Sequence, residues 1–234
     1  MLKLLSIADC ISLTNAIFGF FSILMLFTGF IEDINLRFHI SFSFILLGLL
    51  ADGLDGIVAR KLGKSGIGDY LEAMADVTTL VVAPAIFVYI RYSDIIAFDI
   101  YKNIYLLFAL ILFVFFGFVR LASFNIMKEK KIFVGLPSPA STIIILILSY
   151  IMIDFIFILP AVIIIGAAMA SNLEFAKPNI YMNSIAAILI FISIFIRDSF
   201  NYIGPILLLI AIISYSIFGP FIKKILTKKQ RKGF

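Results

Sequence analysis

The sequence contains no tryptophan, one cysteine and one histidine among its 234 residues. The single cysteine, Cys10, excludes an internal disulfide and a cysteine-ligated metal site. The single histidine, His39, argues against a metal centre built from imidazoles. Charged residues are also scarce, at 14% of the chain compared with about 25% in a typical soluble domain. These shortages exclude an ordinary soluble domain, a disordered chain and a nucleic-acid-binding protein.

Apolar residues are what the chain has in abundance. Hydrophobic residues make up 63% of it, and the mean hydropathy is +1.16. At about 20 residues per span, this predicts an all-α polytopic membrane protein with about eight transmembrane helices inserted in a lipid bilayer. Residues 1–9 are expected to form a short N-terminal interfacial helix. The predicted spans lie near residues 11–31, 38–60, 69–91, 102–126, 138–153, 155–172, 180–197 and 203–222.

The fifth and sixth spans are separated only by Asp154. A single helix over 138–172 would be about 50 Å long, well beyond a hydrocarbon core of about 30 Å. The length therefore predicts a turn at Asp154. We interpret residues 1–222 as one transmembrane domain and residues 223–234 as a basic cytoplasmic tail.

Basic residues are distributed unevenly between the two sides that eight spans would create. The side without the termini has four of the 19 Lys and Arg residues, namely Arg37, Arg91, Lys102 and Arg197. The positive-inside rule therefore places both termini in the cytoplasm. We expect the protein to lie in the cell membrane. His39 is then expected in an extracytoplasmic loop or interface, without chemistry.

Five carboxylates occur where a bilayer should disfavour them, at the end of the second span and the start of the third. An ionised carboxylate in a membrane costs several kcal/mol unless it is paired or binds a metal. They are Asp52, Asp55, Asp69, Glu72 and Asp76.

Their spacing predicts that four of them converge. Asp52 and Asp55 are i,i+3 and share a helix face, and Glu72 and Asp76 are i,i+4 and do the same. A short connection near residue 64 makes the two helices antiparallel neighbours. The four side chains then lie at matched depths, roughly 12–18 Å from the turn.

Four clustered anions repel one another, and divalent metal is the natural remedy. Oxygen-only ligands favour Mg²⁺, Mn²⁺ or Ca²⁺, and two such ions suit phosphoryl transfer. Gly56 and Ala59 leave room for a bulky ligand against the helix, and Arg60 offers a cation for phosphate. From the residues alone, a structural role, an ion-transport site and a metal-dependent enzyme all remain open, with the enzyme favoured.

The acidic motif resembles the signature of the CDP-alcohol phosphotransferase family. The shared pattern runs through Asp52, Asp55, Gly56, Ala59, Arg60, Gly68, Glu72 and Asp76. The family has aspartate at all four acidic positions, whereas the third here is Glu72, one methylene longer. Two more stretches, 8–19 and 120–140, resemble the phosphatidylserine synthase branch, which includes archaetidylserine synthases. The resemblance covers about residues 8–140.

The resemblance implies a reaction in which an alcohol attacks the lipid-side phosphate of CDP-diacylglycerol or CDP-archaeol and CMP leaves. Asp52, Asp55, Glu72 and Asp76 would hold two divalent cations, Mg²⁺ or Mn²⁺, and Asp76 would also be the general base. The CDP-lipid would contact Ser12, Asn15, Gly56, Arg60 and Ser65. The family also implies a homodimer.

For this branch the acceptor would be L-serine, whose carboxylate needs a cation. Candidates for binding it are Arg120, Asn125, Lys131 and Ser138. Arg120 could instead extend to the membrane interface, Lys131 could belong to a positive-inside loop, and Ser65 could only serve its turn. Alternative functions are a sister enzyme using inositol phosphate or glycerol phosphate, and a carboxylate-lined cation transporter.

Overall fold

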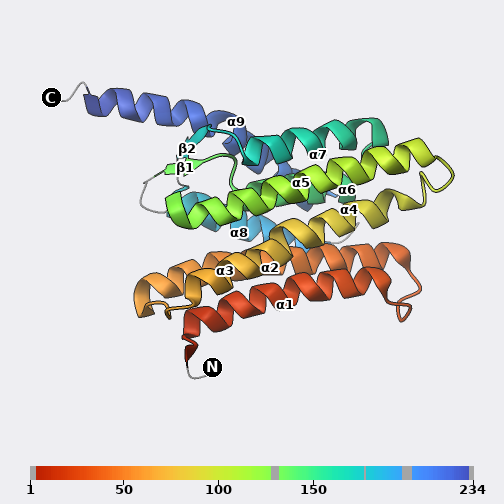
Figure 1. Ribbon diagram of the computed structural model, residues 1–234, viewed down its shortest axis with the longest axis horizontal. Coiled ribbons are helices and arrows are strands. Elements are labelled where there is room, and N and C mark those ends of the chain that lie inside the picture. The colour runs from red at the N-terminus through yellow and green to blue at the C-terminus, as the bar shows by residue number, and fades with distance from the viewer. Residues whose placement is uncertain (1–3, 128–131, 177, 197–201, 232–234) are drawn as a thin grey trace.

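The computed structural model describes residues 4–127, 132–176, 178–196 and 202–231. Within them, eight helical rods run roughly side by side along the long axis of the molecule (Figure 1). The rods confirm the predicted all-α polytopic membrane fold. They are α1 (Ile7–Phe27), α2 (Ile34–Leu62), a continuous rod of α3 (Gly68–Asp76), η2 (Val77–Val82) and α4 (Ala83–Ser93), α5 (Ile100–Met127), α6 (Ser138–Tyr150), α7 (Phe155–Met169), α8 (Ile180–Phe195) and α9 (Ile203–Arg231).

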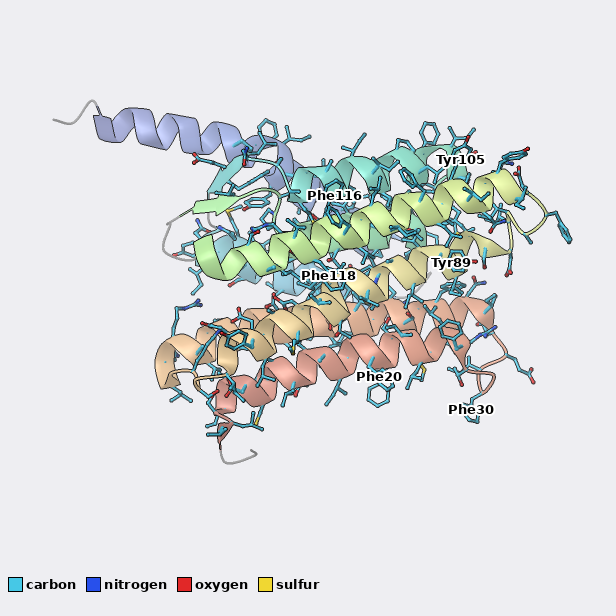
Figure 2. All side chains as sticks on the ribbon, in the orientation of Figure 1. Phe20, Phe30, Tyr89, Tyr105, Phe116 and Phe118 are labelled. Carbon is cyan, nitrogen blue, oxygen red and sulfur yellow. The ribbon has the colours of Figure 1, made fainter. Side chains whose placement is uncertain are left out.

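Five of these rods are long and apolar enough to cross a bilayer, and α6, α7 and α8 are shorter apolar helices of 13, 15 and 16 residues. Large apolar side chains cover the outside of the bundle, where they would meet lipid. Figure 2 shows Phe20 and Phe30 projecting outward from the α1 side, and their exposed fractions are 55% and 97%. The chain is a multi-pass membrane protein.

Helix α1 begins at Ile7, so it starts before the predicted first span and includes residues 7–9 of the expected interfacial helix. Residues 1–3 of that expected helix lie outside the described residues. Ser6 caps this helix: its hydroxyl accepts from the Asp9 backbone N–H, and the Asp9 carboxylate accepts from the Ser6 N–H. This reciprocal capping box fixes the helix start. At the other terminus α9 continues past residue 222 to Arg231, so the predicted tail is helical over most of its length.

A small β-ribbon interrupts the otherwise helical fold. Strands β1 (Ile132–Val134) and β2 (Glu174–Ala176) pair antiparallel, with Phe133 opposite Phe175. Gly135 follows β1 at a φ of 81°, a conformation that favours glycine, and its N–H donates to the Leu173 carbonyl at 2.7 Å. The ribbon ties the α5–α6 connection to the α7–α8 connection.

The predicted turn at Asp154 is confirmed. Helix α6 ends at Tyr150 and α7 begins at Phe155. The Asp154 carboxylate caps α7 by accepting from the Ile156 N–H at 3.0 Å. A carboxylate at this position satisfies a free N–H and complements the helix dipole.

Helix α6 is the innermost helix, with nearly every side chain buried. At its end Tyr150 stacks on Phe42 of α2, with ring centroids 4.3 Å apart. Its hydroxyl lies 2.7 Å from Nδ1 of His39, whose Nε2 is 3.0 Å from the Ile194 carbonyl oxygen of α8. The expectation of a loop or interface position for His39 was therefore wrong, because this side chain is buried and joins three helices.

The two ends of the bundle are different in character. The N-terminus, the α2–α3 turn, the β-ribbon and the C-terminal end of α9 all lie toward one end, on the left in Figure 1. The α1–α2 and α4–α5 connections lie at the other end. This arrangement agrees with both chain termini lying on one side, and it puts the acidic motif at that same end.

Candidate metal and nucleotide site

Helices α2 and α3 bring three of the predicted metal ligands together. One carboxylate oxygen from each of Asp52, Asp55 and Glu72 lies within 4.8 Å of the others. The carboxyl group of Asp76 interacts with that of Asp52 and is close enough to Asp55 and Glu72 for electrostatic interaction with both. The spacing argument therefore located a real cluster. It lies between two helices joined by a short turn, as antiparallel neighbours require.

Helix α1 completes the cluster from a third side. The Ser12 hydroxyl donates to Asp55 Oδ2 at 2.5 Å, and the Asn15 amide donates to Asp76 Oδ1 at 3.0 Å. Both α1 residues are buried, as are both aspartates. These bonds hold each carboxyl group in one orientation, so Ser12 and Asn15 position the acids whether or not they also touch a nucleotide.

Thr79 explains how three helices approach so closely, and the sequence argument missed it. Its side chain fills the space left by Gly19 of α1 and Gly48 of α2, where a Cβ atom at either glycine would overlap it. Its hydroxyl donates to the Asn15 carbonyl at 2.8 Å. Thr79 therefore fixes the backbone of the residue whose side chain holds Asp76.

The helix changes its winding directly after Asp76. Residues Val77–Val82 form a π-helical segment, whose wider turn alters the usual backbone pairing. The Thr142 hydroxyl of α6 donates to the Leu80 carbonyl of this segment at 2.6 Å. No periodicity in the sequence signalled this change, although π-helical turns occur frequently at functional sites.

Two buried oxygens of the site have no hydrogen-bond partner among the described residues. They are Asp55 Oδ1 and Asn15 Oδ1. A buried acceptor without a donor costs free energy, so each needs an explanation. Asp55 belongs to the three-carboxylate group, and a hard cation bound there would satisfy this oxygen. The donor set, oxygen only and strongly anionic, fits Mg²⁺ or Mn²⁺.

Among the described residues, Lys64 is a basic residue that contacts this cluster. Its ammonium group forms ion pairs with Glu72 and, at 3.4 Å, with Asp69 Oδ1. Burial acts to lower the pKa of Lys64, but the hydrogen bonds and charges of Glu72 and Asp69 outweigh it and raise that pKa. Lys64 is therefore charged at neutral pH, and the sequence argument had not singled it out.

The residues predicted to contact the nucleotide surround the cluster at the same end. Arg60 is exposed, and its Nη1 lies 3.7 Å from where a Cβ would stand on Gly56, so the guanidinium runs along the bare face of that glycine. Ser65 lies in the α2–α3 turn, and its hydroxyl accepts from the Ile67 N–H at 3.2 Å. Ser65 thus has a structural task in the turn.

Two of the acceptor-site candidates are buried in neighbouring helices. Arg120 is 6% exposed, so protein encloses its side chain and the alternative of extension to the interface does not hold. Arg120 lies about one helical turn after Gly117, and a Cβ atom at Gly117 would overlap Val81 of η2. Ser138 is 5% exposed and accepts through its carbonyl from Thr142, the residue bonded to Leu80. Both therefore lie about one helical turn from contacts with the segment after Asp76.

The other two candidates cannot be placed. The side chain of Asn125 and the whole of Lys131 lie outside the described residues.

Comparison with known proteins agrees with the family resemblance of the acidic motif. Residues 5–173 match the model of the CDP-alcohol phosphatidyltransferase family. A CDP-diacylglycerol–serine O-phosphatidyltransferase of Methanocaldococcus jannaschii is 32% identical over 179 residues, which cover 76% of this chain and 77% of the relative.

Two other relatives align over shorter regions. An archaetidylserine synthase of Methanothermobacter thermautotrophicus is 32% identical over 143 residues, and a CDP-diacylglycerol–serine O-phosphatidyltransferase of Saccharomyces cerevisiae is 32% identical over 162. These alignments cover 59% and 64% of this chain, and 55% of each relative.

Proposed function

Because the chain belongs to the CDP-alcohol phosphatidyltransferase family, we propose that it transfers a phosphatidyl-type group from a CDP-linked lipid to the hydroxyl of L-serine and releases CMP. The lipid would be CDP-diacylglycerol, which the names of two relatives contain, or CDP-archaeol. The observation that carries the proposal is the convergence of Asp52, Asp55 and Glu72 beside Asp76 within membrane helices.

Asp52, Asp55, Glu72 and Asp76 would hold two divalent cations, Mg²⁺ or Mn²⁺. When bound, such ions neutralise the diphosphate and stabilise the charge that develops on the attacked phosphate and the leaving CMP. The unpartnered Oδ1 of Asp55 supports a ligand at this point. The half-buried side chains of Asp52 and Glu72 leave the cluster open to a nucleotide from the aqueous side.

Asp76 would act as the general base. The serine hydroxyl gives its proton to the Asp76 carboxylate, the serine oxygen forms a bond to the lipid-side phosphorus, and the bond from that phosphorus to the CMP oxygen breaks. Asn15 donates to Oδ1 of Asp76 and so fixes the orientation of this carboxyl group, which leaves the other oxygen to accept the serine proton. A base held in one orientation next to the reacting hydroxyl is what proton transfer requires.

The CDP group would lie along α2, where Gly56 leaves an open face and the Arg60 guanidinium supplies a bidentate phosphate donor. Ser12, Asn15 and Ser65 line the same end of α1 and the α2–α3 turn. The basic residues of the loops at this end support its position on the cytoplasmic side, where CDP-lipids present their water-soluble group, and both termini would lie on that side. We also propose that the protein forms a homodimer, as the family resemblance implies.

Serine would bind between α5, α6 and the segment after Asp76. Arg120 would pair with the serine carboxylate, and Ser138 would offer a hydroxyl, with Asn125 and Lys131 as further polar partners. A dianionic acceptor such as inositol phosphate or glycerol phosphate would need additional cations, and the sequences of α6, α7 and α8 contain no Lys, Arg or His. This observation favours serine over the sister-enzyme acceptors.

An acceptor comparison tests the proposal directly. Purified protein receives a CDP-lipid, a divalent salt and either serine, inositol phosphate or glycerol phosphate, and CMP release and the lipid product are measured. We expect release only with serine, and a serine-containing lipid as product. Release with a phosphorylated acceptor instead would identify a sister enzyme, and cation flux without CMP release would identify a transporter.

Replacing Arg120 by alanine tests the acceptor site. A buried charge-assisted hydrogen bond is worth about 1.5–3 kcal/mol, so the KM for serine should rise about 10- to 100-fold. The KM for the CDP-lipid should change by less than about threefold, because Arg120 lies on α5, away from the α1–α2 side of the site. Lys102→Ala, at the opposite end of α5, is the matched control. Equal changes in both KM values would remove Arg120 from the acceptor site.

A further inference from the structure

The ion pair between Lys64 and Glu72 involves a carboxylate group that the proposed metal site needs. Glu72 Oε2 accepts from the Lys64 ammonium, while Glu72 also contributes one of the three oxygens grouped with Asp52 and Asp55. Lys64 attracts the carboxylates of both Asp52 and Asp55 as well. The Lys64 ammonium group at one edge of this cluster neutralises part of the negative charge that a divalent ion would otherwise neutralise.

The position of Lys64 is built by its neighbours. Gly63 ends α2 at a φ of 83°, which turns the chain back toward α3. Gly68 at the start of α3 has no side chain, and a Cβ there would stand 3.1 Å from the Lys64 Cβ and 2.6 Å from Asp9 Oδ1. The stem of Lys64 therefore packs against bare helix backbone, and its ammonium group is directed along α3 toward Glu72.

Glu72 is one methylene longer than the aspartate typical of its position in the family pattern. The extra length lets one carboxylate contact Lys64 while remaining near the Asp52 and Asp55 oxygens. Asp69 supplies a second partner, 3.4 Å from the ammonium and more exposed than Glu72. Lys64 can thus move off Glu72 onto Asp69 without losing its ion pair.

We propose that Lys64 is a built-in counter-ion that competes with the divalent cation for Glu72 and moves toward Asp69 when the cation binds. The inference rests on the metal site of the proposed function. An ammonium and a divalent ion a few ångströms apart repel each other in a partly buried site, so each weakens the binding of the other to one carboxylate. The lysine stabilises the acidic cluster before metal arrives and weakens metal binding as a consequence.

The test is Mn²⁺ affinity of the purified protein without substrate, measured by the electron paramagnetic resonance signal of free Mn²⁺. Lys64→Met keeps the stem and removes the charge, and we expect it to bind Mn²⁺ at least about tenfold more tightly than wild type. Lys61→Met, an exposed lysine of the same stretch, is the matched control and should change affinity by less than about threefold. Unchanged or weaker binding by Lys64→Met overturns the proposal.

A double-mutant cycle separates competition for Glu72 from a general field effect. In a Glu72→Gln background, the contested carboxylate is gone, and Lys64→Met should gain less than about threefold in affinity. An equal gain in both backgrounds contradicts competition at Glu72. Lys64→Gln serves as a second variant that retains a polar end, and it should reproduce the tighter binding.

The outcomes also separate this inference from the proposed function. If wild type and all variants, each folded by circular dichroism, bind no Mn²⁺, both the metal site and the counter-ion role fail. If wild type binds Mn²⁺ and Lys64→Met leaves the affinity unchanged, only the counter-ion role fails.

Discussion

Replacing Asp76 by asparagine should lower serine-dependent CMP release about a thousandfold while the protein stays folded. The substitution keeps the size of the side chain but removes the group that would accept the serine proton, and general-base catalysis contributes about 10²- to 10⁴-fold. The Asn15 amide, which donates to Asp76 Oδ1 at 3.0 Å, keeps an oxygen acceptor in the variant if the new amide turns its oxygen toward it. The helix interface therefore persists.

The measurement is the rate of CMP release at saturating Mn²⁺, with helix content by circular dichroism as the check on folding. Saturating metal separates loss of the base from weakened metal binding. Asp99→Asn is the control, because Asp99 is a partly exposed carboxylate paired with Lys102 outside the acidic site. Turnover near the wild-type rate in Asp76→Asn would rule out Asp76 as the base.

Replacing Asp55 by asparagine should raise the Mn²⁺ concentration for half-maximal CMP release about 100-fold. Asp55 is 1% exposed, its Oδ2 is held by Ser12 and its Oδ1 has no partner among the described residues. An amide offers one neutral oxygen in place of a charged pair, so a hard cation loses both charge and a ligand. Removal of groups that merely orient metal ligands typically costs 10- to 100-fold, and a ligand should reach the top of this range.

Ser12→Ala provides the graded comparison for Asp55. It removes only the hydroxyl that donates to Oδ2, so the Mn²⁺ requirement should rise about tenfold or less. A larger effect for Ser12→Ala than for Asp55→Asn would mean that α1 contacts the nucleotide at Ser12 and that Asp55 is structural. An unchanged Mn²⁺ requirement in Asp55→Asn would exclude this carboxylate from the metal site.

Local regularities in the sequence were enough to find the acidic cluster. The spacings i,i+3 for Asp52 and Asp55 and i,i+4 for Glu72 and Asp76, with a short turn between, require convergence whatever the rest of the bundle does. The length of residues 138–172 likewise forced a turn, and Asp154 caps the helix that follows it. These predictions depended on helix geometry and bilayer thickness alone.

Contacts between distant segments could not be predicted in this way. Thr79 lies 64 residues from the Asn15 carbonyl that it holds, and Thr142 lies 62 residues from the Leu80 carbonyl that the π-helical segment presents. Nothing in local periodicity indicates which helix fills the space above Gly48. The β-ribbon at 132–134 and 174–176 is similarly a product of two connections meeting at one end of the bundle.

The error at His39 has the same origin. His39 was assigned to a loop or interface because a lone polar residue near the predicted start of a span suggests an end, yet Tyr150 and Ile194 from distant helices satisfy both of its nitrogens. The start of α1 likewise depends on a specific contact, because the Ser6–Asp9 capping box begins the helix at Ile7, before the predicted start of the first span.

The sequence argument did not predict that Lys64 contacts the acidic cluster. Lys64 lies in a short connection rich in Lys and Gly, where a basic residue is ordinarily explained by membrane topology. Only the fold of the α2–α3 turn against Gly68 and Asp9 directs it to Glu72.

The most direct test of the account is the anomalous scattering of Mn²⁺ in crystals of the active protein. The account predicts anomalous density coordinated by oxygens of Asp52, Asp55, Glu72 and Asp76, with the Lys64 ammonium displaced from Glu72. Crystals of a preparation that releases CMP with serine, soaked to saturation in Mn²⁺ and showing no density among these carboxylates, would contradict it.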